Sequence, residues 1–194
     1  IAFLVLQAIV VIHCSCQRVD RSLNPEQDFP QVIPMPRHVR HLNGYCSIDA
    51  STVIHYTNTP SSDLALSAIE LNQSVGTLFF ESLRMVEIGD LSLPEPEHGI
   101  ILRLDGAIQN REGYRLEIKP ERIILSAKTP AGIYYAIQTF SQLLPLNEGK
   151  ALPKISLPCI EIEDYPEYPW RGMHLDVSRH FFPADSIKRF IDYL

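Results

Sequence analysis

The sequence predicts an α+β fold, in which an antiparallel sheet carries helices on one of its faces. Short segments rich in β-branched and aromatic residues alternate with turn residues through much of the chain. Two amphipathic helical patterns flank this run of strands. Near the C-terminus, a strand pattern, a short loop and a third helical pattern follow one another. Strands grouped between helices indicate that the helices cover one face of the sheet.

The expected strands cover residues 52–56, 83–88, 99–104, 114–118 and 122–126. In residues 114–118, Tyr114, Leu116 and Ile118 alternate with charged residues, as is typical of a strand that buries one face. The turn signal at 119–121 predicts that this strand and the next form a hairpin.

Two helices are expected in the same part of the chain. The first follows Ser61 and Ser62 as N-cap candidates and is expected to stop at Gly76. The second begins at Thr129, an N-cap that is followed by a proline at the first helical position, and ends before Pro145.

Composition and net charge indicate a soluble globular protein that does not bind nucleic acid. The 194 residues are 45% hydrophobic and 21% charged, which is typical of a soluble globular protein with one full domain and part of another. The formal net charge is −6. Binding to a phosphate backbone needs clustered lysine and arginine, so no nucleic-acid partner is expected.

Residues 1–16 are expected to be a signal or leader segment, and residues 17–31 a tether. The first twelve residues are apolar except for Gln7, which suits the core of a secretory signal and is too short to span a bilayer. A buried N-terminal strand is the alternative. The sequence thus predicts export to the periplasm, the cell surface or the medium. Ser15 precedes Cys16 as in a lipoprotein cleavage site, and a lipid anchor on Cys16 is the one membrane association that we infer.

The other two cysteines, Cys46 and Cys159, lie far apart in the sequence. They allow one disulfide or two free thiols, and the sequence does not decide between these.

Polar residues inside the C-terminal strand pattern indicate a functional site. Arg171, His174 and Asp176 fall in an apolar segment, where polar groups need partners. The helical pattern after Pro183 continues through Ile187 to Leu194.

Two other clusters of titratable residues are interpreted as surface features. His38 and His41 lie beside arginines that would repel a metal cation, so a solvated loop is expected there. The acidic cluster at 161, 163 and 164 lies along one strand, whereas two glycosidase carboxylates must face each other across the substrate.

The C-terminal segment resembles a known family of enzymes. The matching positions are Arg171-Gly172, Leu175-Asp176-Val177, Ser178-Arg179-His180-Phe181 and Pro183, preceded by Asp164-Tyr165-Pro166 and followed by Ile187-Lys188-Arg189-Phe190-Ile191-Asp192. They resemble the opening of the catalytic barrel in β-N-acetylhexosaminidases of glycoside hydrolase family 20. Glu167 departs from the pattern, in which arginine is frequent at that place.

The resemblance implies two domains. Residues 32–158, which open with an Ile-Pro-Met-Pro segment like that of the family, would form the α+β accessory domain. Residues 159–194 would be the first strand and helix of a truncated (β/α)8 barrel.

The resemblance also implies an activity and a site. In the family, this enzyme removes terminal N-acetylglucosamine or N-acetylgalactosamine from glycans by an exo-acting, substrate-assisted and retaining mechanism. Arg171 would grip the ring hydroxyls of the terminal sugar, while Asp176 and Arg179 would fix the floor of the pocket. The catalytic Asp-Glu pair of the family would lie beyond Leu194, so we expect this chain alone to be inactive. No metal, nucleotide or flavin cofactor is implied.

Three alternatives stay open at this point. The accessory domain could act as a non-catalytic carbohydrate-binding or scaffold module. Arg171 could instead serve a structural ion pair, with Asp176 or with a neighbouring strand. Family members also differ in substrate, which includes chitin fragments and host glycans.

Overall fold

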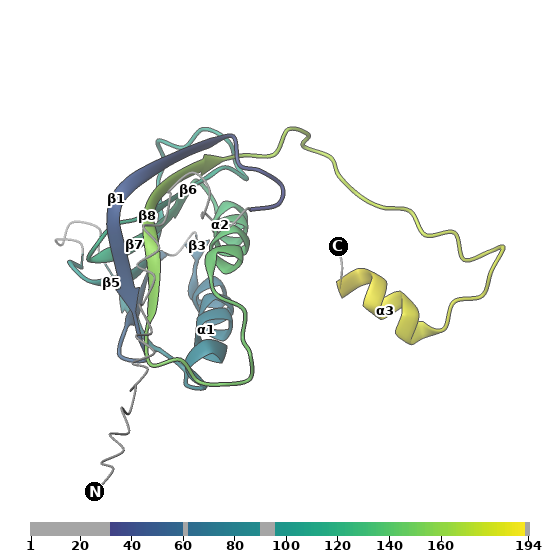
Figure 1. Ribbon diagram of the computed structural model, residues 1–194. Coiled ribbons are helices and arrows are strands. Elements are labelled where there is room, and N and C mark those ends of the chain that lie inside the picture. Colours follow the sequence, from purple (N-terminus) through teal and green to yellow (C-terminus); the bar gives the residue numbers. More distant parts are fainter. Residues whose placement is uncertain (1–31, 60–61, 90–95, 193–194) are drawn as a thin grey trace, which may run out of the picture.

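A computed structural model of the chain describes residues 32–59, 62–89 and 96–192 (Figure 1). The expected leader at 1–16, its Cys16 and the tether at 17–31 lie outside the described residues. The described part forms one twisted sheet with two long helices against it, and a C-terminal segment that extends away from the sheet.

One sheet organises the domain, in the strand order β1-β8-β6-β7-β5-β2-β3, with β4 also paired to β2. The strands are β1 (His38–Ile48), β2 (Val53–Thr59), β3 (Ser62–Asp63), β4 (Arg84–Ile88), β5 (Gly99–Leu104), β6 (Tyr114–Ile118), β7 (Arg122–Ala127) and β8 (Ile155–Asp164).

The sheet is mixed, which corrects the expectation of an antiparallel one. β8 pairs antiparallel with β1 and with β6, and β6 pairs antiparallel with β7. In contrast, β2 is parallel to β4 and β5, and β5 is parallel to β7. The chain passes from β2 through a helix to β4, and a helical crossover makes two strands parallel. Alternation of apolar and polar residues reports which face is buried and carries no information on strand direction.

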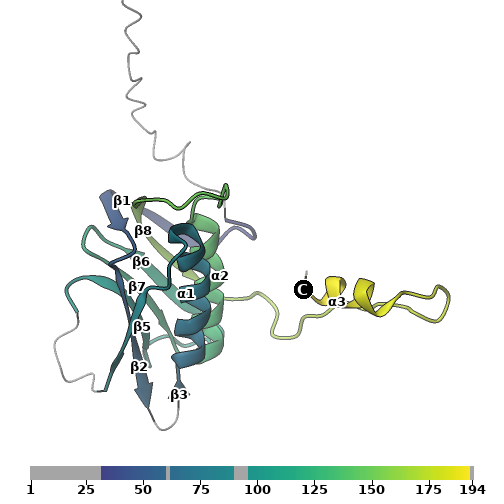
Figure 2. The same ribbon diagram turned by 90° about the horizontal axis from the view of Figure 1, so that it is seen from below.

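Two helices cover one face of the sheet, as the α+β prediction required. α1 (Ala65–Phe79) and α2 (Pro130–Leu143) lie side by side on that face (Figure 2). Between the helices and the sheet lies a continuous apolar core. Its fully buried members include Ile54, Leu71, Leu102, Leu116, Ile137 and Phe140.

The ends of α1 differ from the prediction. Its N-cap is Leu64, without a side-chain capping bond, and Gly76 lies inside the helix. A Cβ at Gly76 would lie 2.7 Å from the carbonyl oxygen of Glu81, and the Glu81 N–H donates to the Gly76 carbonyl. The glycine therefore allows a close approach of the backbone, and the helix ends at Phe79, before Phe80 in the left-handed conformation.

α2 begins as predicted, with Thr129 as N-cap and Pro130 as its first residue. The Thr129 side chain, however, donates a hydrogen bond to the carbonyl of Arg111, at 2.6 Å, and makes no capping bond. It thereby ties the start of α2 to the loop before β6.

The segment around His38 and His41 is part of β1, and the expectation of a loop there is wrong. His38 lies opposite Glu163 and His41 opposite Ile160 of β8. A register shift between His41 and Tyr45 interrupts the pairing of β1 with β8. Because of this shift, apolar and polar residues do not alternate regularly along β1, and the sequence does not show the pattern of a strand.

β8 belongs wholly to the accessory sheet, between β1 and β6. The domain boundary expected after residue 158 therefore moves to the end of β8 at Asp164. Residues 147–158, whose Gly, Lys and Pro are typical of a connection between domains, instead form part of the connection from α2 to β8 and the first four residues of β8.

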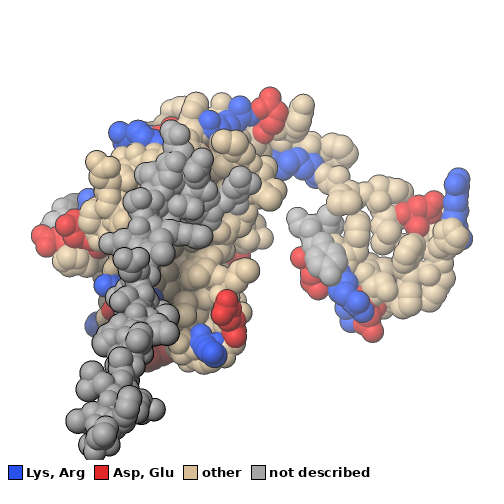
Figure 3. All heavy atoms as spheres, viewed as in Figure 1, with Lys and Arg blue, Asp and Glu red and all other residues tan. Residues whose placement is uncertain are grey.

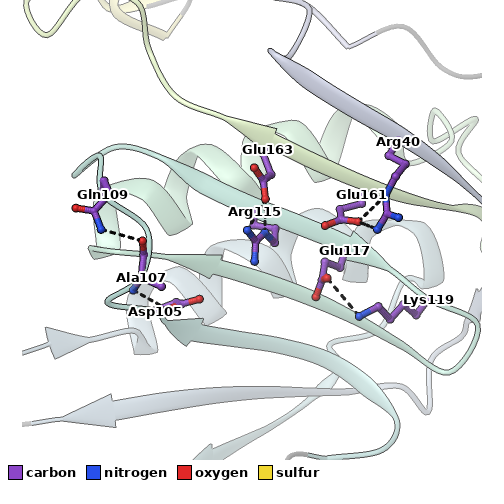
Figure 4. A network of polar contacts seen from close by, with 9 residues as sticks. All are labelled: Arg40, Asp105, Ala107, Gln109, Arg115, Glu117, Lys119, Glu161 and Glu163. Carbon is purple, nitrogen blue, oxygen red and sulfur yellow. Dashed lines mark hydrogen bonds and ion pairs between the residues drawn. The ribbon is translucent and has the colours of Figure 1, made fainter.

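The face of the sheet opposite the helices carries pairs of opposite charges (Figure 4). Arg40 of β1 contacts Glu161, and Arg115 of β6 contacts Glu163, both on β8. Lys119 lies 3.3 Å from Glu117. Cross-strand pairs of this kind suit a solvated sheet face. Positive and negative side chains are likewise interspersed on the face shown in Figure 3.

Cys46 and Cys159 are both buried and both free thiols. Burial raises the pKa of the Cys46 thiol to about 11 and also raises that of Cys159. Both side chains therefore stay protonated near neutral pH, in which form a thiol is a poor nucleophile.

Asn72 of α1 completes the backbone pairing of the residue that precedes β4. Its side-chain amide donates to the carbonyl of Leu83 and its oxygen accepts from the Leu83 N–H, both at 2.8 Å. Asn72 is buried, so water cannot replace the lost partner.

Asn72→Ala should therefore lower the free energy of unfolding by about 2 kcal/mol, which urea unfolding of the chain will measure. The control is Asn147→Ala, because the Asn147 amide bonds the Thr77 carbonyl at an exposed position. Equal losses for the two variants would contradict the role given to Asn72.

The chain after β8 forms one helix, α3 (Ala184–Asp192), and no strand between residues 165 and 183. The strand expected through Arg171, His174 and Asp176 is thus not formed, and these residues are exposed. A strand forms its hydrogen-bond ladder with neighbouring strands, and none of those described lies beside this segment. α3 forms where the pattern predicted it, and none of its residues is buried.

Candidate functional site

A cleft of about 660 Å³ lies where the accessory domain meets the chain that leaves it. Its walls come from residues 32–37, here called the arm, from α2, and from residues 165–171, here called the junction segment. Apolar and aromatic side chains line it together with a few charged and polar ones, a combination that is common in small-molecule sites.

The arm is fastened to α2 by one side chain. Gln142 accepts a hydrogen bond from the Ile33 N–H at 2.8 Å and donates to the Ile33 carbonyl at 3.0 Å. The extended arm, which contains a cis Ile33-Pro34 peptide bond, thus has its backbone paired by a side chain.

Arg37, at the end of the arm, holds the junction segment. Its backbone N–H donates to Asp164 at 3.2 Å, and its Nε donates to the Tyr165 carbonyl at 3.1 Å. Its Nη2 pairs with the carboxylate of Glu167. The guanidinium also lies 4.2 Å from the centre of the Tyr165 ring, a cation–π distance.

Asp164 connects this contact to the sheet and to α2. The hydroxyl of Tyr114 donates to Asp164 at 3.4 Å and lies 2.5 Å from the hydroxyl of Thr139. Burial raises the pKa of the Tyr114 hydroxyl, which therefore stays a neutral donor. The last residue of β8 is thereby fixed from two sides.

Arg171 lies against the accessory domain. Its two terminal nitrogens each lie 3.2 Å from one carboxylate oxygen of Glu112, and Nη2 is also 3.0 Å from the Tyr135 hydroxyl. Nη1 donates to the Tyr168 carbonyl. Hydrogen bonds with Arg171 hold the pKa of the Glu112 carboxyl below its usual value, and those with Glu112 raise the pKa of Arg171.

The other predicted site residues lie apart from Arg171. Asp176 accepts hydrogen bonds from the backbone N–H and the hydroxyl of Ser178, at 2.8 and 2.6 Å, which lower the pKa of its carboxyl. Arg179 lies 3.8 Å from Asp176 and is exposed. Asp176 and Arg179 therefore pair with each other, and the ion partner of Arg171 is Glu112 rather than Asp176.

The described carboxylates of the cleft suit binding better than acid catalysis. Glu112 and Glu167 each face an arginine, and Asp164 accepts from an N–H and a hydroxyl. A glycosidase general acid needs a raised pKa, whereas that of Glu112 is lowered. Proton transfer in this cleft would therefore need other groups than these carboxylates.

Within residues 32–59, 62–89 and 96–192, no three His, Cys, Asp or Glu side chains gather as metal ligands would. In the same ranges, no helix combines the length and apolarity that a membrane span requires.

Sequence reasoning found Arg171 but missed its partners. Glu112 and Tyr135 lie 59 and 36 positions before it, and Arg37 was noted only as a neighbour of the histidines. The packing of α2 against the loop before β6 brings these residues together. Short-range patterns hold no information on such contacts.

Two family models match the chain in succession. The model for glycosyl hydrolase family 20, domain 2, matches residues 29–165, and the model for the family's catalytic domain matches residues 168–194. The division between them falls at the end of β8, where the structure also places it.

Known relatives and structures agree with these matches. A beta-hexosaminidase of Porphyromonas gingivalis is 30% identical over 93% of this chain and 23% of its own length. A beta-N-acetylhexosaminidase of Cellulomonas fimi is 37% identical over 43% of this chain and 16% of its own. A mutant Streptomyces plicatus beta-hexosaminidase in complex with GlcNAc superposes with a TM-score of 0.69 at 31% identity, over 85% of this chain and 32% of that one.

The chain thus spans about a quarter to a third of the length of the relatives it matches over most of its residues. The first family model alone covers more than two thirds of the chain. The second family model follows the first along the chain, as the C-terminal segment follows the accessory domain in the structure. The chain therefore belongs to glycosyl hydrolase family 20.

Proposed function

We propose that this chain is part of an exo-acting β-N-acetylhexosaminidase, which releases terminal N-acetylglucosamine or N-acetylgalactosamine from glycans. The observation that carries the proposal is the placement of Arg171. It is the fourth residue of the segment matched by the catalytic-domain model, and it lies in a cleft with a fork of donors.

The proposed role of Arg171 follows from its geometry. A guanidinium offers parallel N–H donors that fit two adjacent oxygen atoms, and Arg171 already engages both oxygens of Glu112 in this way. A pair of vicinal hydroxyls on a sugar ring can take the place of that carboxylate. Arg171 would then orient the terminal sugar, and Asp176 with Arg179 would support the pocket floor.

The proposed chemistry needs residues that the described part does not supply. By membership of the family, a Glu acts as general acid, and an Asp orients the 2-acetamido group of the substrate. The acetamido oxygen attacks the anomeric carbon, so the product keeps its configuration. We place this Asp-Glu pair in the remainder of the barrel.

Two further proposals concern the whole protein. We infer export, because the apolar run at 1–12 has the size of a signal core. The lipid anchor on Cys16 belongs to the same proposal. Mass spectrometry of the mature N-terminus tests both: a mature protein that still carries the apolar run at 1–12 contradicts export, and an unmodified Cys16 contradicts the anchor.

The test of the proposed function is an assay on the full-length protein. We expect release of N-acetylglucosamine and N-acetylgalactosamine from their aryl β-glycosides. A soluble, folded full-length protein that releases neither sugar would contradict the proposal.

The 194-residue chain alone should be inactive toward the same substrates. It holds Arg171 and the first barrel helix, and its described cleft carboxylates all have partners. If the purified 194-residue chain hydrolysed these aryl glycosides faster than the same chain with Arg171→Ala, this prediction would be contradicted.

A further inference from the structure

Resting on the proposed function, we infer that Arg37 is a positioning residue for Arg171. Arg37 lies on the accessory domain, and its side chain contacts two residues of the junction segment, Tyr165 and Glu167. The partners of the Arg171 guanidinium are Glu112, Tyr135 and Tyr168. The action of Arg37 on a bound sugar is therefore indirect, through the course of the chain that carries Arg171.

The contacts of Arg37 fix the junction segment just after β8. Its backbone N–H bonds Asp164, its Nε bonds the Tyr165 carbonyl, and its guanidinium meets Glu167 and the ring of Tyr165. The Arg37 side chain thus restrains Tyr165 and Glu167 in an otherwise irregular segment, while its backbone holds Asp164. Charge-assisted bonds of this kind are stronger than those between neutral groups.

Further hydrogen bonds connect Arg37 to α2 through the arm and to Arg171 through the junction segment. On the domain side, Gln142 fastens the arm to α2 through two bonds to Ile33. On the junction side, the next residue after Glu167 is Tyr168, whose carbonyl accepts from Arg171. A continuous path of contacts therefore leads from α2 through Arg37 to the guanidinium of Arg171.

This arrangement gives the accessory domain a part in substrate binding. The arginine of the site follows a segment without helix or strand, and such a segment has many conformations when nothing holds it. Holding it in place before the sugar arrives reduces the entropy lost on binding. Loss of Arg37 should thus weaken sugar binding without removing any group that touches the sugar.

Arg40 provides a matched control. It lies three residues further along, pairs with a glutamate of β8 as Arg37 does with Glu167, and is likewise exposed. Its partner Glu161 sits within the sheet, however, and neither residue lines the cleft. Arg40→Ala removes a similar ion pair and leaves the junction segment untouched.

The experiment uses the full-length protein and an aryl N-acetyl-β-glucosaminide. We expect Arg37→Ala to raise KM about tenfold with kcat little changed, because a positioning residue affects binding in the ground state and the transition state alike. Arg37→Lys should be intermediate, since lysine keeps the charge but loses the fork. Arg40→Ala should leave KM unchanged.

A double-mutant cycle separates positioning from general damage. In an Arg171→Ala background, Arg37→Ala should raise KM by less than about twofold, because its effect passes through Arg171. Equal effects of Arg37→Ala with and without Arg171, or an unchanged KM in the single variant, would overturn the inference.

A second readout does not depend on activity. Hydrogen exchange of the peptide that contains residues 165–171 should be faster in Arg37→Ala than in wild type or in Arg40→Ala. Unchanged exchange would overturn the inference whether or not the protein hydrolyses glycosides. If the wild-type protein has no hydrolase activity, the proposed function is contradicted. The hydrogen-exchange measurement then still tests the role of Arg37.

Discussion

Arg171→Ala in the full-length protein is expected to lower kcat/KM for aryl N-acetyl-β-glucosaminides by about 100- to 1000-fold. Two hydrogen bonds from a charged donor to the sugar contribute about 3–4 kcal/mol together, and each 1.4 kcal/mol corresponds to a factor of ten. Steady-state kinetics of the variant measure this loss directly.

Two other variants sharpen this prediction. Arg171→Lys should recover only a small part of the lost activity, because an ammonium group cannot donate two parallel bonds. Arg115→Ala, which removes an arginine paired to Glu163 on the outer sheet face, should leave kcat/KM near wild type. If Arg171→Ala kept more than a tenth of wild-type kcat/KM, Arg171 would be a structural residue only.

Gly132→Val is expected to cause the largest loss of stability, about 3–4 kcal/mol in the free energy of unfolding. A Cβ at this position of α2 would lie 2.5 Å from the Gly113 carbonyl oxygen and 2.7 Å from the Cβ of Ala127. The first neighbour is a backbone atom and the second is a Cβ fixed directly to the backbone of β7, so neither can turn away, and relief requires a shift of α2 away from the sheet. Urea unfolding of the 194-residue chain measures the effect.

Gly106→Val is the matched control, because a Cβ at Gly106 meets no atom within 4 Å. It should change the free energy of unfolding by less than about 1 kcal/mol. Comparable losses at the two glycines would show that backbone entropy, and not the close approach of α2 to β7 and to Gly113, determines the cost.

Much of the accessory domain could be predicted from local patterns. The strands at 99–104 and 114–118 have the predicted bounds, and α2 begins at the predicted cap. In these elements, alternation or helical periodicity coincides with burial against one core, so the sequence pattern follows directly from the packing.

The features that were missed depend on long-range contacts. β1 contains a register shift, which breaks its alternation, and strand direction in the sheet depends on connections through α1. Gly76 was expected to end the helix because glycine is frequent at helix ends, but it lies inside α1, where the carbonyl oxygen of Glu81 leaves no room for a Cβ.

The site was predicted in part. Arg171 does lie in a cleft, but the strand expected to carry it is absent from the described segment, and its partners Glu112 and Tyr135 come from the accessory domain. The roles of Asp176 and Arg179 stay predictions, since the two residues contact each other and not Arg171. A strand pattern describes what a segment can form, and neighbouring strands decide whether it forms.

We propose that Arg171 belongs to a site that cleaves N-acetylhexosaminides with help from the substrate's acetamido group. The most direct test compares kcat/KM of the full-length protein for two aryl β-glycosides that differ only at carbon 2, N-acetylglucosaminide and glucoside. We predict a preference of about 1000-fold or more for the acetamido sugar, because the glucoside has no internal nucleophile. Equal rates for the two sugars, or faster cleavage of the glucoside, would contradict the account.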